Sequence, residues 1–419
     1  MNKIKRLAPL LMIIVANIIG FGILFFTAEG IDVQSLYYSL ALLGVVLISF
    51  CLIVFFSLGD DYLFLIVSML LTIGIIMLFR INPEVAVRQI IWFYVGMAGS
   101  YVVYFLFRFI KKWDRAVVLY IAVSLILFLV TLVFGRAEGG AKNWISVGSI
   151  SVQPSEIIKI LFVMTLASMY TAPYTDDIEG NFIERHFNSE TGRQLMIMAV
   201  AYVNLGFLVL QREWGSAVLY FLIYFVMQYV FGTKKRILWA NIVLACLGGI
   251  GGFMTMTHIQ ERVAIWQDPF ADAGDMGYQI VQSLYAMASG GFMGSGLGQG
   301  SPDLIPVVKS DFIFSAIYEE FGMLGATAVI MLFFLLVYRG IKISLRCTNT
   351  FNKALTLGIS LMFGFQTFII IGGVTKFIPM TGITLPFMSA GGSSLAASFM
   401  ALAILQAVSG RKEDMSDDI

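Results

Sequence analysis

The chain is poor in charge: Asp, Glu, Lys and Arg make up only 13% of its 419 residues, whereas hydrophobic residues make up 59%. A soluble globular domain carries roughly twice that share of charged residues. The two signs also nearly cancel, with 27 basic and 26 acidic side chains and a net charge of +1. This balance gives no sign of a nucleic-acid partner, which needs a strongly basic surface.

Metal-binding and disulfide-forming side chains are also scarce. The chain has two histidines, His186 and His258, and three cysteines, Cys51, Cys246 and Cys347. Two of the cysteines fall in apolar runs and the third in a basic loop, so they suggest no disulfide framework. So few histidines disfavour a histidine-rich metal cluster or a Ser-His-Asp site.

Long apolar runs are what the chain has in abundance, and its mean hydropathy is +0.87. Runs of about 20 residues are long enough to cross a hydrocarbon core of about 30 Å as helices, which satisfy their own backbone in lipid. They predict an all-α polytopic membrane protein with about twelve transmembrane helices, whereas membrane-barrel strands would alternate in polarity. The predicted spans are 8–28, 36–57, 62–79, 89–110, 116–134, 155–172, 195–211, 215–232, 237–256, 311–338, 354–373 and 384–408.

The distribution of Lys and Arg predicts the orientation. With the N-terminus inside, about two thirds of the 27 basic residues lie in inner segments, as the positive-inside rule expects. Both termini are then cytoplasmic, the first helix is retained rather than cleaved, and the two histidines lie on opposite sides of the membrane. The outer polar segments are 135–154, 211–215, the long loop 257–310, which we expect to carry short packed helices, and 372–386.

The segment from Gln153 to Lys159 predicts a helix start, because Pro154 suits a first helical position. Glu156 and Lys159 are three residues apart and share a face. They form either an ordinary stabilising pair or an ion pair that positions a polar substrate at the outer surface. Glu213, in the tip between two spans, either belongs to a tight turn or faces the same outer cavity.

Asp311 lies where the long outer loop enters an apolar helix. It is either a helix-capping acid or a general base. The helix start would lower its pKa, whereas the apolar residues after it would raise it by desolvation. Two turns deeper, Glu319 and Glu320 need partners if they face the bundle.

Two irregular segments flank this helix in the sequence. The stretch Gly277–Gln282 leads into glycines up to Gly300, which match neither a Walker loop nor a dinucleotide fingerprint. Exposed backbone N–H groups there could bind phosphate oxygens. In the segment Lys376–Ser394, prolines and glycines break the helix; its first half predicts backbone lining a cavity, and its second half predicts close helix packing.

Four separated blocks together resemble the shape, elongation, division and sporulation (SEDS) family of bacterial membrane proteins, which includes RodA, FtsW and SpoVE. In order and spacing they match that family over roughly residues 60–408. The blocks are Trp144 with Gln153–Glu156 and Lys159; Gly277–Gln282 with the glycines; Ser310–Phe314 with Glu319–Gly322; and Pro379–Ser394.

The resemblance implies a peptidoglycan glycosyltransferase that polymerises lipid II on the outer face of the bacterial cytoplasmic membrane. It implies a class B penicillin-binding protein as the transpeptidase partner. It places the essential loop aspartate, as general base, on Asp311, with polyprenyl diphosphate as the leaving group. A divalent cation (Mg²⁺ or Mn²⁺) could assist, although no motif requires a metal. The expected substrate-binding residues are Glu156, Lys159, Arg88, Glu213, Trp144 and Lys376.

Two departures from the family pattern matter. The usual Pro-Asp-Leu-Gly tip reads Arg212–Gly215, which replaces the aspartate by Glu213. Two extra spans precede the common ten. The expected organisation is therefore two additional helices (1–57), a glycosyltransferase core (58–408, with the outer loop 257–310) and a cytoplasmic tail (409–419).

Two other functions fit the composition: a lipid II flippase or transporter, and a non-catalytic scaffold for a cell-wall synthase. The candidate polar residues gather at one predicted face of the membrane. A transporter would place its site near the middle of the membrane, so this clustering favours the enzyme.

Overall fold

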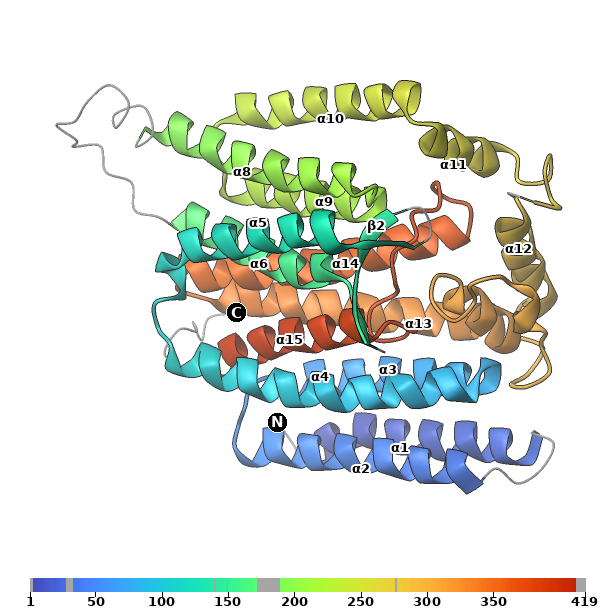
Figure 1. Ribbon diagram of the computed structural model, residues 1–419. Coiled ribbons are helices and arrows are strands. Elements are labelled where there is room, and N and C mark those ends of the chain that lie inside the picture. The colour runs from blue at the N-terminus through green and yellow to red at the C-terminus, as the bar shows by residue number, and fades with distance from the viewer. Residues whose placement is uncertain are drawn as a thin grey trace. The chain divides into compact units, whose positions relative to one another are not determined.

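The computed structural model describes residues 3–27, 33–138, 141–148, 150–171, 189–275 and 277–411 (Figure 1). Three short strands accompany the helices: β1 (Arg136–Glu138), β2 (Ala141–Val147) and β3 (Ile150–Val152). The short 3-10 helices are η1 (Trp113–Arg115) and η2 (Pro302–Leu304). The α-helices are α1 (Lys3–Thr27), α2 (Val33–Phe55), α3 (Asp61–Ile81), α4 (Pro83–Phe109), α5 (Val117–Phe134), α6 (Pro154–Thr171), α8 (Glu190–Leu210), α9 (Trp214–Phe231), α10 (Lys235–Thr255), α11 (Thr257–Gln267), α12 (Tyr278–Gly290), α13 (Ile313–Arg346), α14 (Thr350–Val374) and α15 (Gly392–Ser409).

Among the described residues, 11 helices are long and apolar enough to cross a membrane. This confirms the all-α polytopic membrane fold. The expected span at 155–172 is present as α6 but is not among the 11, because Glu156 and Lys159 reduce its apolar content. The last expected span starts later than predicted, since residues 384–391 are irregular and α15 begins at Gly392.

The junction between α3 and α4 shows how the sequence sets helix boundaries. α3 ends at Ile81 because Asn82 precedes a proline, which disfavours helical backbone at that position. Pro83 then occupies the first position of α4, where its missing N–H leaves no hydrogen bond unmade. The side-chain oxygen of Asn82 accepts a hydrogen bond from the Val85 N–H at 3.0 Å, as helix caps do.

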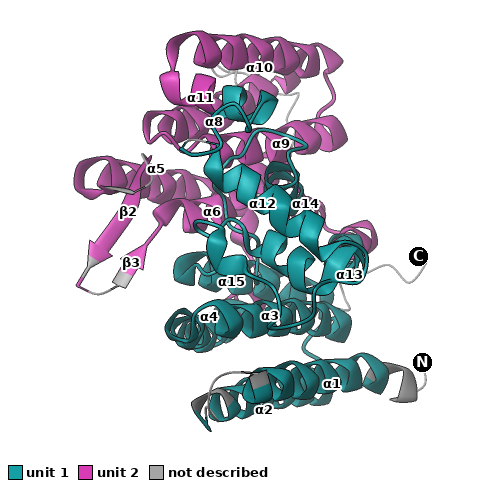
Figure 2. Cartoon of the chain, turned by 90° about the vertical axis from the view of Figure 1, so that its right-hand side faces the viewer, with its two compact units in different colours: residues 1–105, 262–339, 366–411 teal, residues 106–261, 340–365, 412–419 magenta. Residues whose placement is uncertain are grey.

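The chain divides into two compact units, coloured separately in Figure 2. Unit 1 comprises residues 1–105, 262–339 and 366–411, and unit 2 comprises 106–261, 340–365 and 412–419. The expected boundaries at residues 57 and 408 stay predictions. Residues 412–419 of the expected tail, together with His186, lie outside the described residues.

In unit 1, the two additional N-terminal helices pack against α3. The Ser39 hydroxyl of α2 donates to the Asn17 side-chain oxygen of α1 at 2.6 Å, and both side chains are buried. At Gly20 of α1, an added Cβ would lie 2.4 Å from the Ile76 side chain of α3. The small residue therefore permits a close helix crossing, as is common in membrane proteins.

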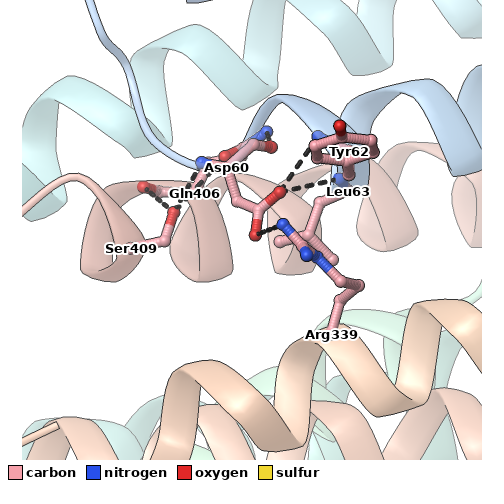
Figure 3. Close-up of polar contacts among 6 residues, drawn as sticks. All are labelled: Asp60, Tyr62, Leu63, Arg339, Gln406 and Ser409. Atoms are coloured by element: carbon pink, nitrogen blue, oxygen red, sulfur yellow. Dashed lines mark hydrogen bonds and ion pairs between the residues drawn. The ribbon is translucent and has the colours of Figure 1, made fainter. Parts of the chain in front are cut away.

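A polar clasp at Asp60 joins three helices of unit 1 (Figure 3). The Asp60 carboxylate caps α3 by accepting the Tyr62 N–H at 2.9 Å, and it forms an ion pair with Arg339 of α13. The Arg339 guanidinium also lies 4.8 Å from the centre of the Tyr62 ring. From α15, the Gln406 amide donates to the Asp60 carbonyl at 2.8 Å, and the Ser409 hydroxyl accepts from the Asp60 N–H at 2.9 Å.

In unit 2, the polar segment between α5 and α6 contains structure that the sequence did not predict. Strands β1, β2 and β3 form an antiparallel sheet in that order. The sheet is tied to the turn between α8 and α9, because the Lys142 N–H donates to the Gln211 carbonyl at 3.1 Å.

Candidate active site

Asp311, two residues before α13, lines a cavity of about 200 Å³ in unit 1. Typical ligand pockets measure about 300–1,000 Å³, so this cavity suits the reacting part of a larger substrate. As the sequence predicts, irregular backbone between α14 and α15 forms part of its wall. The other polar side chains of the wall are Arg262 and Trp266 of α11, Gln279 of α12 and Lys376 after α14.

Arg262 is the charged residue of this cavity that the sequence did not single out. Its Nη1 donates to the Met380 carbonyl at 2.9 Å, which joins α11 to the segment after α14. A Cβ on Gly382 would lie 3.6 Å from Asp311 Oδ2 and 3.9 Å from Arg262 Nη2. The carboxylate and the guanidinium therefore converge on Gly382, where the absent side chain leaves space.

The desolvation expected at the Asp311 carboxyl dominates, and the effect of the helix start stays a prediction. Burial raises its pKa above the ordinary value, and this outweighs the Ser310 hydrogen bond and the Arg262 charge, which both lower it. A carboxylate with a raised pKa is a stronger proton acceptor and suits a general base. Burial also lowers the pKa of Arg262, against the opposing influence of Asp311.

Three non-glycine residues around this region have left-handed backbone: Val307 (φ 55°), Lys376 (φ 60°) and Phe387 (φ 64°). Such conformations cost about 1–3 kcal/mol each and cluster at functional sites. Lys376 lines the cavity itself. The Val307 carbonyl accepts the Asp311 N–H at 3.2 Å, so the turn that presents Asp311 includes a strained β-branched residue.

The two acids deeper in α13 have partners in unit 1, as expected for acids that face the bundle. Glu320 Oε1 lies 3.1 Å from Arg80 Nε, and Glu319 Oε1 accepts the Ser301 N–H at 2.9 Å. Both side chains are buried. Arg80 is thus the ion-pair partner of the buried Glu320 carboxylate.

The expectation that the glycine-rich stretch offers N–H groups to phosphate is not met at several of its glycines. The Gly298 N–H donates to Glu320 Oε2 at 3.2 Å, and the Gly296 N–H donates to the Glu320 carbonyl at 3.0 Å. The Gly294 N–H donates to the Gly290 carbonyl at 2.8 Å. These glycines hold the segment after α12 against α13.

In unit 2, Glu156, Lys159 and Glu213 are all buried around the start of α6. Lys159 Nζ lies 2.9 Å from Glu156 Oε2. Glu213 Oε1 accepts hydrogen bonds from Gln153 Nε2 at 3.0 Å and from the Ser155 hydroxyl at 3.2 Å. Burial raises the pKa of Glu213, and the hydrogen bonds of Gln153 and its neighbours partly offset this.

Two predicted residues remain, Trp144 in unit 2 and Arg88 in unit 1. Trp144 is half-buried on β2, paired with Arg136 of β1. Arg88 is exposed on α4, whereas its neighbour Gln89 is buried and contacts the segment before α15. The structure thus brings Asp311 and Lys376 to one cavity in unit 1.

Known proteins resemble this chain over most of its length. Residues 46–414 match the FtsW/RodA/SpoVE family of cell cycle proteins. The chain is 31% identical to the peptidoglycan glycosyltransferase RodA of Mycobacterium bovis, over 97% of this chain and 90% of that protein. It is 32% identical to the stage V sporulation protein E of Bacillus subtilis, over 84% of this chain and 96% of that protein.

Solved structures agree with the sequence relatives. A chain from a structure described as the structural coordination of polymerization and crosslinking by a peptidoglycan synthase complex aligns with a TM-score of 0.68 and 26% identity, over 84% of this chain and 97% of that chain. RodA of Thermus thermophilus aligns with a TM-score of 0.62 and 23% identity, over 86% of this chain and 98% of that chain, and supports the fold alone. This chain therefore belongs to the FtsW/RodA/SpoVE family of multi-span membrane proteins.

Proposed function

We propose that this chain is a peptidoglycan glycosyltransferase that polymerises lipid II, with Asp311 as the general base. The observation that carries the proposal is a carboxyl group of raised pKa facing the same cavity as Arg262 and Lys376. Relatives that cover most of this chain are named peptidoglycan glycosyltransferases. Those names favour the enzyme over a flippase or a scaffold.

The reaction is a direct displacement. The Asp311 carboxylate takes the proton from the 4-hydroxyl of an acceptor GlcNAc, and that oxygen attacks the anomeric carbon of the donor MurNAc. The bond between this carbon and the diphosphate oxygen breaks, and polyprenyl diphosphate leaves with the bonding electrons. The displacement converts an α-linked donor into a β-linked product.

The cations of the cavity would stabilise the negative charge that develops on the departing diphosphate. Arg262 and Lys376 line the cavity with Asp311 and are the first candidates. We keep Lys159, Glu156, Glu213, Arg88 and Trp144 as proposed substrate-binding residues. The buried Glu156–Lys159 pair would act by orienting polar groups of the donor.

A divalent cation (Mg²⁺ or Mn²⁺) could assist the departure of the diphosphate, and the proposal assigns it no step. Within the described ranges, no three His, Cys, Asp or Glu side chains gather as a cation site. Mg²⁺ is usually bound by one or two carboxylates together with substrate phosphates, so a divalent cation could bind at the diphosphate of the donor.

The proposed setting is the bacterial cytoplasmic membrane, with both termini in the cytoplasm and the Asp311 cavity on the outer side. A class B penicillin-binding protein is the proposed transpeptidase partner. The similar chain from a polymerization and crosslinking complex supports a partner of this kind.

The test is glycan-chain formation from purified lipid II in detergent, with the partner present. Asp311→Asn keeps the shape of the side chain and removes the base, so we expect polymer formation to fall by at least about a hundredfold. Asp303→Asn is the matched control, because Asp303 is an exposed acid of the same segment that does not line the cavity. Polymer formation at the wild-type rate by Asp311→Asn would refute the role of Asp311. A wild-type chain that makes no polymer would favour the flippase or the scaffold.

A further inference from the structure

We infer that Gln89 and Ser389 are positioning residues that hold the backbone of Asp311 in place through a relay of hydrogen bonds. The relay runs from α4 through the irregular segment before α15 to Ser310. The inference rests on the proposed role of Asp311 and adds residues to which the proposed reaction assigns no part.

Ser389 makes the contact nearest to the proposed base. Its hydroxyl donates a hydrogen bond to the carbonyl of Ser310, the residue directly before Asp311. The same oxygen accepts the Leu385 N–H at 2.9 Å. A second bond runs alongside, because the Ala390 N–H donates to the Lys309 carbonyl at 2.8 Å. The two residues before Asp311 are therefore each hydrogen-bonded to this segment, Ser310 by Ser389 and Lys309 by Ala390.

Gln89 fixes Ser389 in turn. Its Nε2 donates to the Ser389 carbonyl at 2.9 Å, and its Oε1 accepts the Gly391 N–H at 3.1 Å. One side-chain amide thus satisfies two backbone groups that lie outside any helix. An apolar side chain of similar size at position 89 would leave the buried Ser389 carbonyl without this hydrogen bond, at about 1–3 kcal/mol, and would also remove the bond of the part-buried Gly391 N–H.

Within the irregular segment before α15, the five residues that end at Ser389 are all buried. Ser389 is 4% exposed, Met388 is fully buried and Gln89 is 3% exposed. From α3, Gly74 brings its backbone so close that an added Cβ would lie 2.7 Å from Met388 Cα. Phe387, two residues before Ser389, has a strained φ of 64°. Such backbone persists only where its surroundings fix it, and the contacts of Gln89 and Gly74 provide that.

The relay affects the chemistry because the direction of the Asp311 side chain follows from its backbone. The Ser310 hydroxyl and the Arg262 guanidinium of α11 partly offset the rise that burial causes in the Asp311 pKa. Lys376, in the segment after α14, is the other cation of the cavity. If the turn at Ser310 moves, Asp311 leaves these groups and loses its alignment with the acceptor hydroxyl. Misplacement by about 1 Å can cost about a hundredfold in rate.

The experiment compares Ser389→Ala and Gln89→Leu with matched controls in the lipid II polymerisation assay, over a range of pH. Ser100→Ala removes a buried hydroxyl of α4 that donates within its own helix, to the Met97 carbonyl. Gln406→Leu removes a buried amide that also donates to a backbone carbonyl, that of Asp60. Ser389→Cys keeps the volume of the side chain with a weak donor, so it tests the hydrogen bond if the alanine variant does not fold.

We expect kcat to fall about 10- to 100-fold in Ser389→Ala and Gln89→Leu, with KM changed less than about threefold. We also expect the acid limb of the pH–rate profile to move to higher pH, and Ser389→Cys to do the same to a smaller degree. The controls should keep both kcat and the profile. An unchanged profile and kcat in folded Ser389→Cys and Gln89→Leu would overturn the relay, even if Asp311→Asn is inactive. Activity in Asp311→Asn would instead refute the proposed function.

Discussion

The buried ion pair of unit 2 allows the sharpest test of the substrate-binding residues. Lys159 Nζ and Glu156 Oε2 are 2.9 Å apart, and their side chains are only 5% and 11% exposed. Breaking a buried ion pair by removing one partner costs about 3–5 kcal/mol. We therefore expect Lys159→Met and Glu156→Gln to lower the apparent Tm by roughly 10 °C each, at about 2–4 °C per kcal/mol.

The double variant separates structure from function. With both charges removed, no buried charge is left unpaired, so stability should return to within about 1–2 kcal/mol of wild type. If the pair also orients the lipid-linked donor, polymer formation should stay at least about tenfold below wild type despite that recovery. The assay pairs thermal unfolding in detergent with lipid II polymerisation on the same samples. A double variant with the wild-type rate would show that the pair acts only as a helix-stabilising pair. Single variants with an unchanged Tm would refute the reasoning from burial.

Two further predictions follow from unit 1. In Arg262→Gln, Asp311 loses a cation that lowers its pKa. The Asp311 pKa should therefore rise, and because a base is active only above its pKa, the acid limb of the kcat/KM–pH profile should move to higher pH. An acid limb at the wild-type position would contradict this. In Gly322→Ala, a Cβ would lie 2.2 Å from the backbone nitrogen of Gly294 at a φ of 66°, so we expect a loss of at least about 1–3 kcal/mol in thermal unfolding. Gly248→Ala, with open space around its Cβ, is the control and should not lose stability.

The sequence predicted the helices well because a long apolar run in lipid has few alternatives to a helix. It predicted the segment after Lys376 as a cavity wall because Pro379, Gly382 and Pro386 cannot continue a helix. The sheet at 136–152 was missed because β1 and β3 have only three residues each, and the apolar–polar alternation in 145–147 and 150–152 is too brief to predict a strand. Such features depend on contacts with distant residues, which local patterns do not encode.

The candidate site was predictable only in part. Arg262 was missed because a single arginine in a long polar segment has no local pattern that distinguishes it from a solvated charge. Arg88 and Gln89 are adjacent, but successive residues of a helix point about 100° apart, so one can be exposed while the other is buried. Which of the two faces the protein depends on helix packing.

The clasp at Asp60 also constrains the order in which the protein can assemble. Asp60 caps α3 through residues beside it, so this role is available as soon as α3 forms. Its partner Arg339 follows 279 residues later and Gln406 346 residues later. Contacts so distant in sequence delay folding, because the intervening chain must first be made and placed. During most of translation, Asp60 therefore lacks its ion-pair partner Arg339. The contacts of Asp60 with α15 can form only after that helix has been synthesised.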